Sequence, residues 1–292
     1  MFEHITPPDP EVVRSIVRAA LEEDRARHDV TTHALVPPDQ RGAATVVYRE
    51  GGIVCGLEVA RAAFEELSSA CELHALLPDG WSTEPGDEVA TVEGPLGAML
   101  SAERVALNLL QRMSGIATLT RRFVEAAAAG GRAQITDTRK TTPGLRELER
   151  YAVRVGGGRN HRNSLEDGVL IKDNHIAAAI ARGLSIADVV REARRRAPHT
   201  LRVEIEVTDP ATALLALAAG PDVILLDNMA VEEMRQVVES AGEDVLIEAS
   251  GGVHLDTVAA VASTGVDLIS VGALTHSAPA LDIAFEVQAQ AQ

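Results

Sequence analysis

The sequence contains only two lysines, Lys140 and Lys172, beside twenty-five arginines. Both lie in one stretch, 137–175, that is dense in groups able to bind or react with an anion. Lysine is a compact point charge with rotatable donors and a pKa that its surroundings can shift, so a site can require it specifically. The placement favours a functional role for both lysines over chance survival in an arginine-rich composition.

Further cationic groups accompany the lysines. Arg139 immediately precedes the first of them, and a glycine run at 156–158 leads into His161 and Arg162. Arginine binds a carboxylate through two parallel hydrogen bonds, histidine adds a donor and lysine adds a point charge. Together they favour a substrate with more than one carboxylate, or with a carboxylate and a phosphate. The alternative for Lys172 is the Schiff-base nucleophile of an aldolase-like barrel.

The distribution of charge points the same way. A net charge of −16 argues against nucleic acid or an anionic membrane surface as the main partner. Residues 139–162 hold seven Lys or Arg against two acids, so this segment carries +5 and the remainder −21. A basic island in an acidic chain favours a pocket for a small anion. The alternative is a basic helix face paired with acids elsewhere in the fold.

Carboxylates recur at the ends of later apolar runs. Glu204 and Glu206 lie two residues apart on a predicted strand and so share one face, and Asp227 ends the next run. Buried carboxylates need a cation or sugar hydroxyls beside them. Mg²⁺, with water and substrate phosphates, suits such oxygen ligands. The alternative is a carboxylate–arginine network that stabilises the fold.

Two glycine-containing loops, 248–252 and 270–277, are candidates for binding a phosphate. Each follows a predicted strand, and such loops commonly turn backbone N–H groups and a helix dipole toward an anion. Ser250 and His276 could add donors.

Six short apolar runs, alternating with helical segments, must position these groups. The spacing predicts parallel βαβ units, in a barrel short of eight strands or a doubly wound sheet. In both folds ligand-binding groups gather at the carboxyl ends of the strands, which is where the candidate residues fall. The runs are 133–138, 168–173, 202–207, 222–227, 244–249 and 267–272.

The preceding part of the chain predicts a separate mixed α/β region. The last of its helices has Ser101 as its N-cap candidate and a break of small residues at 114–118, and we expect the linker between the two regions near 110–130. The predicted helices are 10–23, 57–70 and 101–129, and the predicted strands are 42–48, 52–56 and 88–93.

Composition excludes several classes of protein. Hydrophobic residues make up 46% of the chain, which is ample for a core, but the longest candidate span, 213–220, is too short to cross a bilayer. The N-terminus shows no secretory signal. Cys55 and Cys71 have neither metal-ligand spacing nor a disulfide framework, so we expect a cytoplasmic protein.

Eight segments together resemble the quinolinate phosphoribosyltransferase family, over roughly residues 10–285. The central pair is long and specific, whereas the glycine loops alone would not be. The segments are LEEDRARHDVTT (21–32), ERVALNLLQRMSGIAT (103–118), DTRKTTPGLRELERYAV (137–153), GGGRNHRNSLEDGVLIKDNH (156–175), EIEV (204–207), ILLDNM (224–229), EASGG (248–252) and SVGALTHS (270–277).

The resemblance implies an α/β fold with two domains. An N-terminal α/β sandwich, 1–112, would be rejoined by the C-terminal tail, 277–292, and an incomplete, open TIM-like α/β barrel would occupy 113–276. It further implies a homodimer with shared active sites. The implied reaction transfers the phosphoribosyl group of phosphoribosyl pyrophosphate to quinolinate with decarboxylation. It yields nicotinate mononucleotide, pyrophosphate and CO₂ for NAD biosynthesis, with Mg²⁺ as cofactor.

The resemblance also implies roles for individual residues. Quinolinate would be held by Arg104 from the partner subunit and by Arg139, His161, Arg162 and Lys172. Phosphoribosyl pyrophosphate would contact Lys140, Glu206, Asp227, Ser250, Gly251, Gly252, Gly272 and His276. Lys140, Lys172, Glu206 and Asp227 would be catalytic, and Glu206 and Asp227 would hold Mg²⁺ directly or through water.

Two further readings stay open beside the aldolase. One is a phosphoribosyltransferase for a different pyridine or azole acid, although several cations favour a dicarboxylate over nicotinate. The other is a related protein that binds an anion without turnover, against which the facing acids argue.

Overall fold

The computed structural model describes residues 5–242 and 244–288. The chain divides into two compact units, which are described separately. The first unit comprises Met1–Arg121, Thr141–Gly157 and Leu274–Gln292, and the second comprises Arg122–Lys140 and Gly158–Ala273.

These units differ in two places from the domains expected at 1–112 and 113–276. Helix α4, Leu96–Ala128, runs without interruption through the expected boundary. Residues 141–157 belong to the first unit. They include helix α5, Arg146–Val155, which forms hydrogen bonds with side chains of that unit. One such bond joins the Tyr151 hydroxyl to a carboxylate oxygen of Asp79 at 2.9 Å. The last four residues of the expected tail, 289–292, lie outside the described residues.

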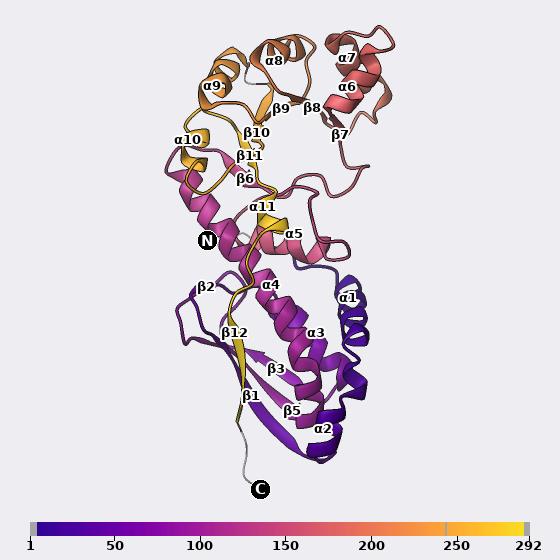
Figure 1. Ribbon diagram of the computed structural model, residues 1–292, viewed down its shortest axis with the longest axis vertical. Coiled ribbons are helices and arrows are strands. Elements are labelled where there is room, and N and C mark those ends of the chain that lie inside the picture. The colour runs from indigo at the N-terminus through magenta and orange to yellow at the C-terminus, as the bar shows by residue number, and fades with distance from the viewer. Residues whose placement is uncertain (1–4, 243, 289–292) are drawn as a thin grey trace. The chain divides into compact units, whose positions relative to one another are not determined.

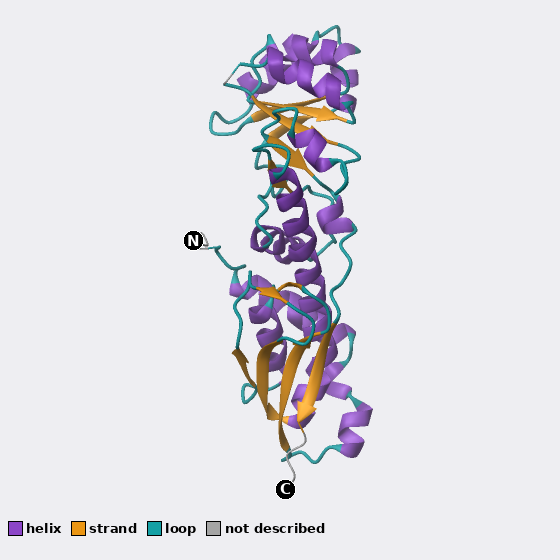
Figure 2. Cartoon of the chain, turned by 90° about the vertical axis from the view of Figure 1, so that its left-hand side faces the viewer, coloured by secondary structure: helices purple, strands orange, loops and turns teal. Residues whose placement is uncertain are grey.

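A four-stranded antiparallel sheet in the order β12-β1-β5-β3 forms the first unit's framework. The C-terminal strand β12 pairs with β1, so that Val46 lies opposite Phe285 and Tyr48 opposite Ile283. Figure 2 shows these strands side by side, with helices along one face. The strands are β1 Arg41–Tyr48, β3 Glu72–Ala75, β5 Glu88–Pro95 and β12 Ile283–Gln288, and a separate pair is formed by β2 Gly52–Ile53 and β4 Ser82–Thr83.

Local signals explain where the first unit's helices begin. Asp9 accepts a hydrogen bond from the amide of Glu11 and caps the first helix. Asp29 caps the next by accepting from Thr31 and Thr32. Besides α4 and α5, the helices are α1 Pro10–Glu23, the 3₁₀ helix Ala26–His28, α2 Val30–Leu35 and α3 Leu57–Leu67.

The sequence misplaced the start of α4 and its expected break. The helix begins at Leu96, and Ser101 instead donates to Asp29 at 3.1 Å. The small residues at 114–118 serve packing. A Cβ on Gly115 would lie 1.9 Å from the carbonyl oxygen of Pro279, so only glycine lets that segment approach the unbroken helix.

Two other predicted elements, a strand and a helix, were too long. The expected strand 52–56 contains only β2, because Gly56 adopts a φ of +109° and caps α3. The carboxylate of Asp79 accepts from the amides of Gly56 and Leu57 at 2.9 and 3.3 Å and so fixes the start of that helix. Its predicted end at 70 falls back to Leu67.

All six predicted apolar runs are strands of one parallel sheet in the second unit. Its order is β6-β11-β10-β9-β8-β7. Strands β6 and β7 are consecutive in the chain yet stand at the two ends of this order, which is the topology of a barrel left open between them. The predicted open TIM-like barrel is thereby confirmed. The strands are β6 Gln134–Thr136, β7 Val169–Ile171, β8 Val203–Val207, β9 Val223–Asp227, β10 Leu246–Ser250 and β11 Leu268–Ser270.

Helices connect these strands, and Figure 1 shows α8 and α9 on the same side of β8–β10. Helices cover the strands, and Ile205, Ile224 and Leu226 are accordingly fully buried. Ser185 and Asp209 cap α7 and α8. The helices are α6 Asp173–Ile180, α7 Ile186–Arg196, α8 Pro210–Leu217, α9 Val231–Ser240 and α10 Val258–Ala262, followed by the short α11 Ala273–His276.

Among the described residues, no helix has the length and apolar character needed to cross a membrane.

Candidate active site

The carboxyl ends of the parallel strands bring most of the predicted site residues of the second unit to one edge of the sheet. Parallel strands point the same way, so the residues that end or follow them gather there. The residues concerned are Arg139 and Lys140 after β6, Lys172 after β7, Glu206 in β8, Asp227 at the end of β9, Ser250, Gly251 and Gly252 at the end of β10, and Gly272 after β11.

Asp137 holds the loop that carries His161. Its side chain is fully buried and accepts hydrogen bonds from the Asn160 amide group at 2.6 Å and from the His161 backbone N–H at 2.7 Å. The backbone N–H of Asp137 donates to the carbonyl of Arg159 at 3.1 Å, and Arg159 forms a parallel bridge with Thr136. The loop therefore lies along the open edge of β6.

His161 directs Nε2 toward two buried glutamates. Nε2 lies 3.3 Å from an oxygen of Glu204 and 3.6 Å from an oxygen of Glu248. Nδ1 accepts the backbone N–H of Arg162 at 2.8 Å. In the neutral ring the proton is therefore on Nε2, facing the two carboxylates. Each glutamate also has one buried oxygen without a hydrogen-bond partner within the described part of the chain.

Burial and mutual repulsion keep protons in this His161–Glu204–Glu248 cluster. Burial, and secondarily the charge of Glu204, raises the pKa of Glu248 to about 7, against the opposing effect of His161. Burial opposes a charged imidazole, but the contact with Glu204 and the charge of Glu248 outweigh it and raise the pKa of His161. Two carboxylates this close cannot both ionise freely, so the cluster retains a proton near neutral pH.

The same three side chains are spaced like metal ligands, with their ligand atoms within 4.8 Å of one another. The hydrogen bond to Nδ1 argues against a metal, because it leaves no lone pair on Nε2 of the neutral ring. The cluster is better described as hydrogen-bonded.

Glu206 and Asp227 fit Mg²⁺ better. In the register of β8 and β9, Glu206 lies beside Leu225, two residues before Asp227, so the two carboxylates share a face. Lys172 Nζ already lies 3.1 Å from one oxygen of Glu206, and the Asn228 amide donates to Asp227 at 3.0 Å. Two carboxylates with partly used oxygens suit an ion that keeps its waters and takes its other ligands from substrate phosphates.

Arg139 and Arg162 are on neighbouring segments, because Asp137, two residues before Arg139, accepts the backbone N–H of His161, one residue before Arg162. Burial, and then the charge of Arg139, lowers the pKa of Arg162, whose guanidinium donates to the carbonyl of Gly168 at 3.0 Å. In the described part of the chain, the buried Nε of Arg139 has no hydrogen-bond partner. Two like charges held together with an unused buried donor are an arrangement that an anion would stabilise.

The backbone of the turn after β10 lies close to Asn228. Gly251 and Gly252 adopt φ values of +86° and +60°, and Asn228 adopts +56°. The Asn228 backbone N–H donates to the carbonyl of Ser250 at 2.9 Å. A Cβ on Gly251 would lie 2.4 Å from the Asn228 side-chain oxygen, so this position requires glycine both for its backbone conformation and for space.

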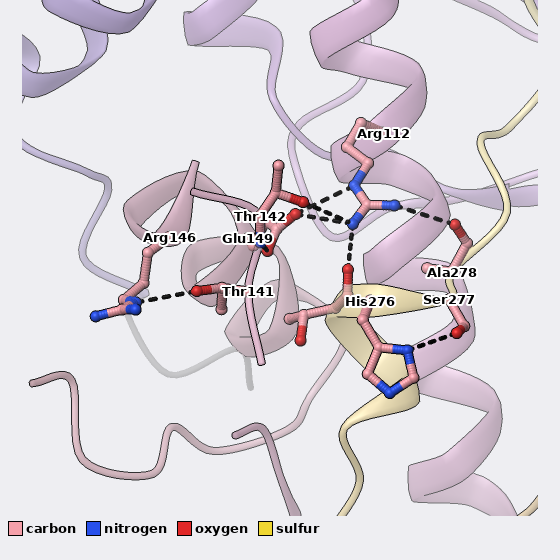
Figure 3. A network of polar contacts seen from close by, with 9 residues as sticks. Arg112, Thr141, Thr142, Arg146, Glu149, His276, Ser277 and Ala278 are labelled. Carbon is pink, nitrogen blue, oxygen red and sulfur yellow. Dashed lines mark hydrogen bonds and ion pairs between the residues drawn. The ribbon is translucent and has the colours of Figure 1, made fainter. Parts of the chain in front are cut away.

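Two predicted residues lie in the first unit. Arg104 is exposed on α4, with its guanidinium 3.8 Å from Glu103. His276 is exposed at the end of α11, and its Nδ1 lies 2.6 Å from the Ser277 hydroxyl, as Figure 3 shows.

Sequence reasoning missed a second set of polar residues, the Arg112–Glu149 network of the first unit (Figure 3). Arg112 Nη2 lies 2.8 Å from Glu149, whose side chain is 1% exposed. The available signal was the position of Glu149 on α5, four residues before the buried Val153, where a core residue is expected. Sequence reasoning placed Asp137 and Glu248 at strand ends among the candidate ligand-binding groups and Glu204 in the acidic pair with Glu206, but it did not predict that all three contact His161.

The fold and the site define a class. An open parallel α/β barrel, with cations and carboxylates at the carboxyl ends of its strands and a left-handed glycine turn beside them, is a scaffold for an enzyme acting on small anions.

Comparisons with known proteins make this specific. The model of the quinolinate phosphoribosyl transferase N-terminal domain matches residues 29–114, and that of the C-terminal domain matches residues 116–286. The chain belongs to this family.

Individual relatives match over nearly the whole chain. A probable nicotinate-nucleotide pyrophosphorylase [carboxylating] of Methanothermobacter thermautotrophicus is 41% identical over 284 residues, covering 95% of this chain and 98% of the relative. The human nicotinate-nucleotide pyrophosphorylase [carboxylating] is 38% identical, covering 94% of this chain and 93% of the relative. The structure of the nicotinate-nucleotide pyrophosphorylase from Francisella tularensis superposes with a TM-score of 0.91 at 35% identity, covering 98% and 99% of the two chains.

Proposed function

We propose that this protein transfers the phosphoribosyl group of phosphoribosyl pyrophosphate to quinolinate, with loss of CO₂, to give nicotinate mononucleotide and pyrophosphate in NAD biosynthesis. The relatives' names support this reaction. The observation that carries it here is the proximity of Arg139 and Arg162 at one barrel edge, where Lys172 also stands, because a dicarboxylate needs several cations at once.

Quinolinate binds through its two carboxylates. Arg139 and Arg162 take one or both as bidentate partners, and Lys172 adds a point charge. His161 belongs to the same group, but both of its ring nitrogens face protein atoms, Glu204 and the Arg162 amide. Its contribution is therefore to hold the loop that presents Arg162, and a direct contact with quinolinate requires the ring to turn.

Phosphoribosyl pyrophosphate binds beside it. Backbone N–H groups at Gly251, Gly252 and Gly272, with Ser250 and His276, hold the 5-phosphate. Lys140 faces the pyrophosphate. Glu206 and Asp227 face the ribose and hold Mg²⁺ directly or through water, and the ion supplies charge neutralisation on the leaving pyrophosphate.

Transfer proceeds by attack of the pyridine nitrogen on the anomeric carbon as the bond to pyrophosphate breaks. Glu206 and Asp227 stabilise the positive charge that develops on the ribose, and Lys140 stabilises the negative charge that develops on the leaving group. Holding both substrates in line supplies much of the remaining acceleration.

Decarboxylation follows on the quaternised ring. The electron pair of the broken bond to CO₂ stays on the adjacent ring carbon, where the positive charge of the nitrogen stabilises it, and a proton then takes the place of CO₂. Lys172, held at 3.1 Å by Glu206, shields the developing negative charge.

The active site is shared within a homodimer in this proposal, with Arg104 reaching the partner's quinolinate. Its exposure on α4 supports this role. Mixing inactive Arg104→Ala with inactive Lys172→Ala subunits should restore partial activity in heterodimers. Proven subunit exchange without any recovered activity would contradict the shared site. The free thiols of Cys55 and Cys71 are consistent with a cytoplasmic location.

The deciding experiment is chromatographic detection of nicotinate mononucleotide. Purified protein is incubated with phosphoribosyl pyrophosphate, Mg²⁺ and either quinolinate or nicotinate, with and without EDTA. We expect product and an equal amount of CO₂ from quinolinate alone, and none with EDTA. Equal product from nicotinate, or no product from folded dimer with metal present, would overturn the proposal.

A further inference from the structure

We propose that Arg112 and Glu149 are positioning residues for phosphoribosyl pyrophosphate. Together they fix the main chain that follows Lys140 and the main chain on both sides of His276. The inference rests on the proposed function, since Lys140 and His276 are assigned to that substrate there.

The two charged side chains are themselves immobilised. Glu149 is buried on α5, and one of its oxygens lies 3.2 Å from Nε and 2.8 Å from Nη2 of Arg112, a residue of α4. A guanidinium that meets a carboxylate through two nitrogens has a fixed plane and direction. Its remaining donors can therefore specify where other groups lie.

Those donors go to the segment that carries His276. Arg112 Nη1 donates to the carbonyl of Ala278 at 3.2 Å, and Nη2 donates to the carbonyl of Thr275. The two carbonyls flank His276 and Ser277, so the guanidinium grips the main chain before and after that pair. Figure 3 shows this arrangement, with the imidazole pointing away from the guanidinium.

The other end of the ion pair holds the segment that follows Lys140. The second oxygen of Glu149 accepts the backbone N–H of Thr142 at 3.0 Å, and Arg112 Nη2 reaches the Thr142 hydroxyl at 3.5 Å. Arg146 of α5 adds a bond to the Thr141 hydroxyl at 3.0 Å. Because Thr142 is only two residues after Lys140, these bonds fix the position of the main chain that follows the lysine.

One ion pair thus joins Thr142 to Thr275 and Ala278, which follow it by 133 and 136 residues, and so links two loops that carry groups assigned to the same substrate. An ion pair that served stability alone would not need to bond to either of these loops. The arrangement makes Arg112 specific, since lysine keeps the charge but offers no planar fork to serve a carboxylate and two carbonyls together.

The test compares steady-state kinetics of Arg112→Lys and Glu149→Gln with wild type, varying each substrate in turn. Loosening the two loops should raise KM for phosphoribosyl pyrophosphate about tenfold in Arg112→Lys and less in Glu149→Gln, which still accepts from Thr142. KM for quinolinate should change less, by about twofold, because among the groups assigned to it only Arg139 lies on one of these loops, whereas Arg104, His161, Arg162 and Lys172 do not.

Tyr151→Phe is the matched control. It removes a part-buried polar contact of the same helix, the bond to Asp79, but touches neither loop. It should lower thermal stability and leave KM for phosphoribosyl pyrophosphate unchanged.

The outcomes separate cleanly. Wild-type protein that makes no nicotinate mononucleotide refutes the proposed function itself. If wild type is active, an unchanged KM for phosphoribosyl pyrophosphate in folded Arg112→Lys overturns the positioning role. An equal rise in Tyr151→Phe also overturns it. If Arg112→Lys does not fold, KM for phosphoribosyl pyrophosphate in Glu149→Gln decides whether the ion pair has a positioning role.

Discussion

Two glutamates, Glu149 in the first unit and Glu248 in the second, are equally buried, with side chains 1% exposed, yet their surroundings are opposite. Glu149 has hydrogen-bond donors on both oxygens, from the Arg112 guanidinium and the Thr142 amide. Glu248 faces another carboxylate, Glu204, and its nearest cationic candidate lies 3.6 Å away.

The comparison separates two uses of a buried charge. A carboxylate whose two oxygens both accept hydrogen bonds, one of them from a guanidinium, is fully paired and holds neighbouring segments in place. One that is buried, repelled by a neighbour and left with an unpaired oxygen has its pKa raised, here to about 7. Such under-paired groups are expected where a substrate completes the arrangement.

The largest effect should come from breaking the paired glutamate. Arg112→Ala leaves Glu149 buried with its charge uncompensated, which should lower the free energy of unfolding by about 3–5 kcal/mol. Chemical denaturation at constant pH measures this. Arg61→Ala, which breaks the exposed pair with Glu58, should cost at most about 1 kcal/mol. Similar small losses of unfolding free energy in both variants would show that buried Glu149 does not require the Arg112 guanidinium.

Removing a cation from the second unit should instead affect activity. Arg162→Ala should lower kcat/KM for quinolinate by about 30–1000-fold, or about 2–4 kcal/mol, through loss of a bidentate charged contact. Its unfolding free energy should change by only about 1 kcal/mol, the value of the bond to Gly168. Kinetics like those of wild type would remove Arg162 from the site.

The under-paired glutamate should give the protein a pH-dependent stability. The pKa of Glu248 is raised in the folded state from its ordinary value of 4.5 to about 7, so the folded protein holds a proton that the unfolded chain has lost in this interval. Stability from this group is full below the unfolded pKa and is lost as the pH rises through the folded pKa.

Glu248→Gln keeps the neutral form at all pH values and should remove this loss. Relative to wild type, the variant should gain a few kcal/mol in unfolding free energy between about pH 5 and about pH 8. Denaturation curves at both values, with Glu232→Gln as an exposed control, test this. Parallel pH profiles for Glu248→Gln and wild type would mean that Glu248 is ionised throughout.

The smallest effect should come from the glycine turn. Gly251→Ala forces a Cβ against Asn228 at a φ of +86°, and should cost about 1–3 kcal/mol and weaken phosphoribosyl pyrophosphate binding. Gly252→Ala, at +60° with its nearest atom 3.8 Å away, should cost about 1 kcal/mol. Equal losses would show that the close approach to Asn228 is unimportant.

Local pattern was enough for the strands of the second unit. Apolar runs such as 222–227 reflect a parallel sheet buried on both faces, and that requirement acts on consecutive residues. Helix boundaries in the first unit were less accurate, because Ser101 and Gly115 look like a cap and a break until the contacts with Asp29 and Pro279 are known.

The sequence by itself determined where the six strands of the second unit lie along the chain, the basic island between Arg139 and Arg162 and the segments that place the chain in its family, since all of these are properties of neighbouring residues. Only the tertiary structure decided which carboxylates are fully paired and which are left in need of a partner. Arg112 meets Glu149 across 37 residues and Ala278 across 166. Burial and pairing at such separations depend on how the chain folds back, which periodicity does not record.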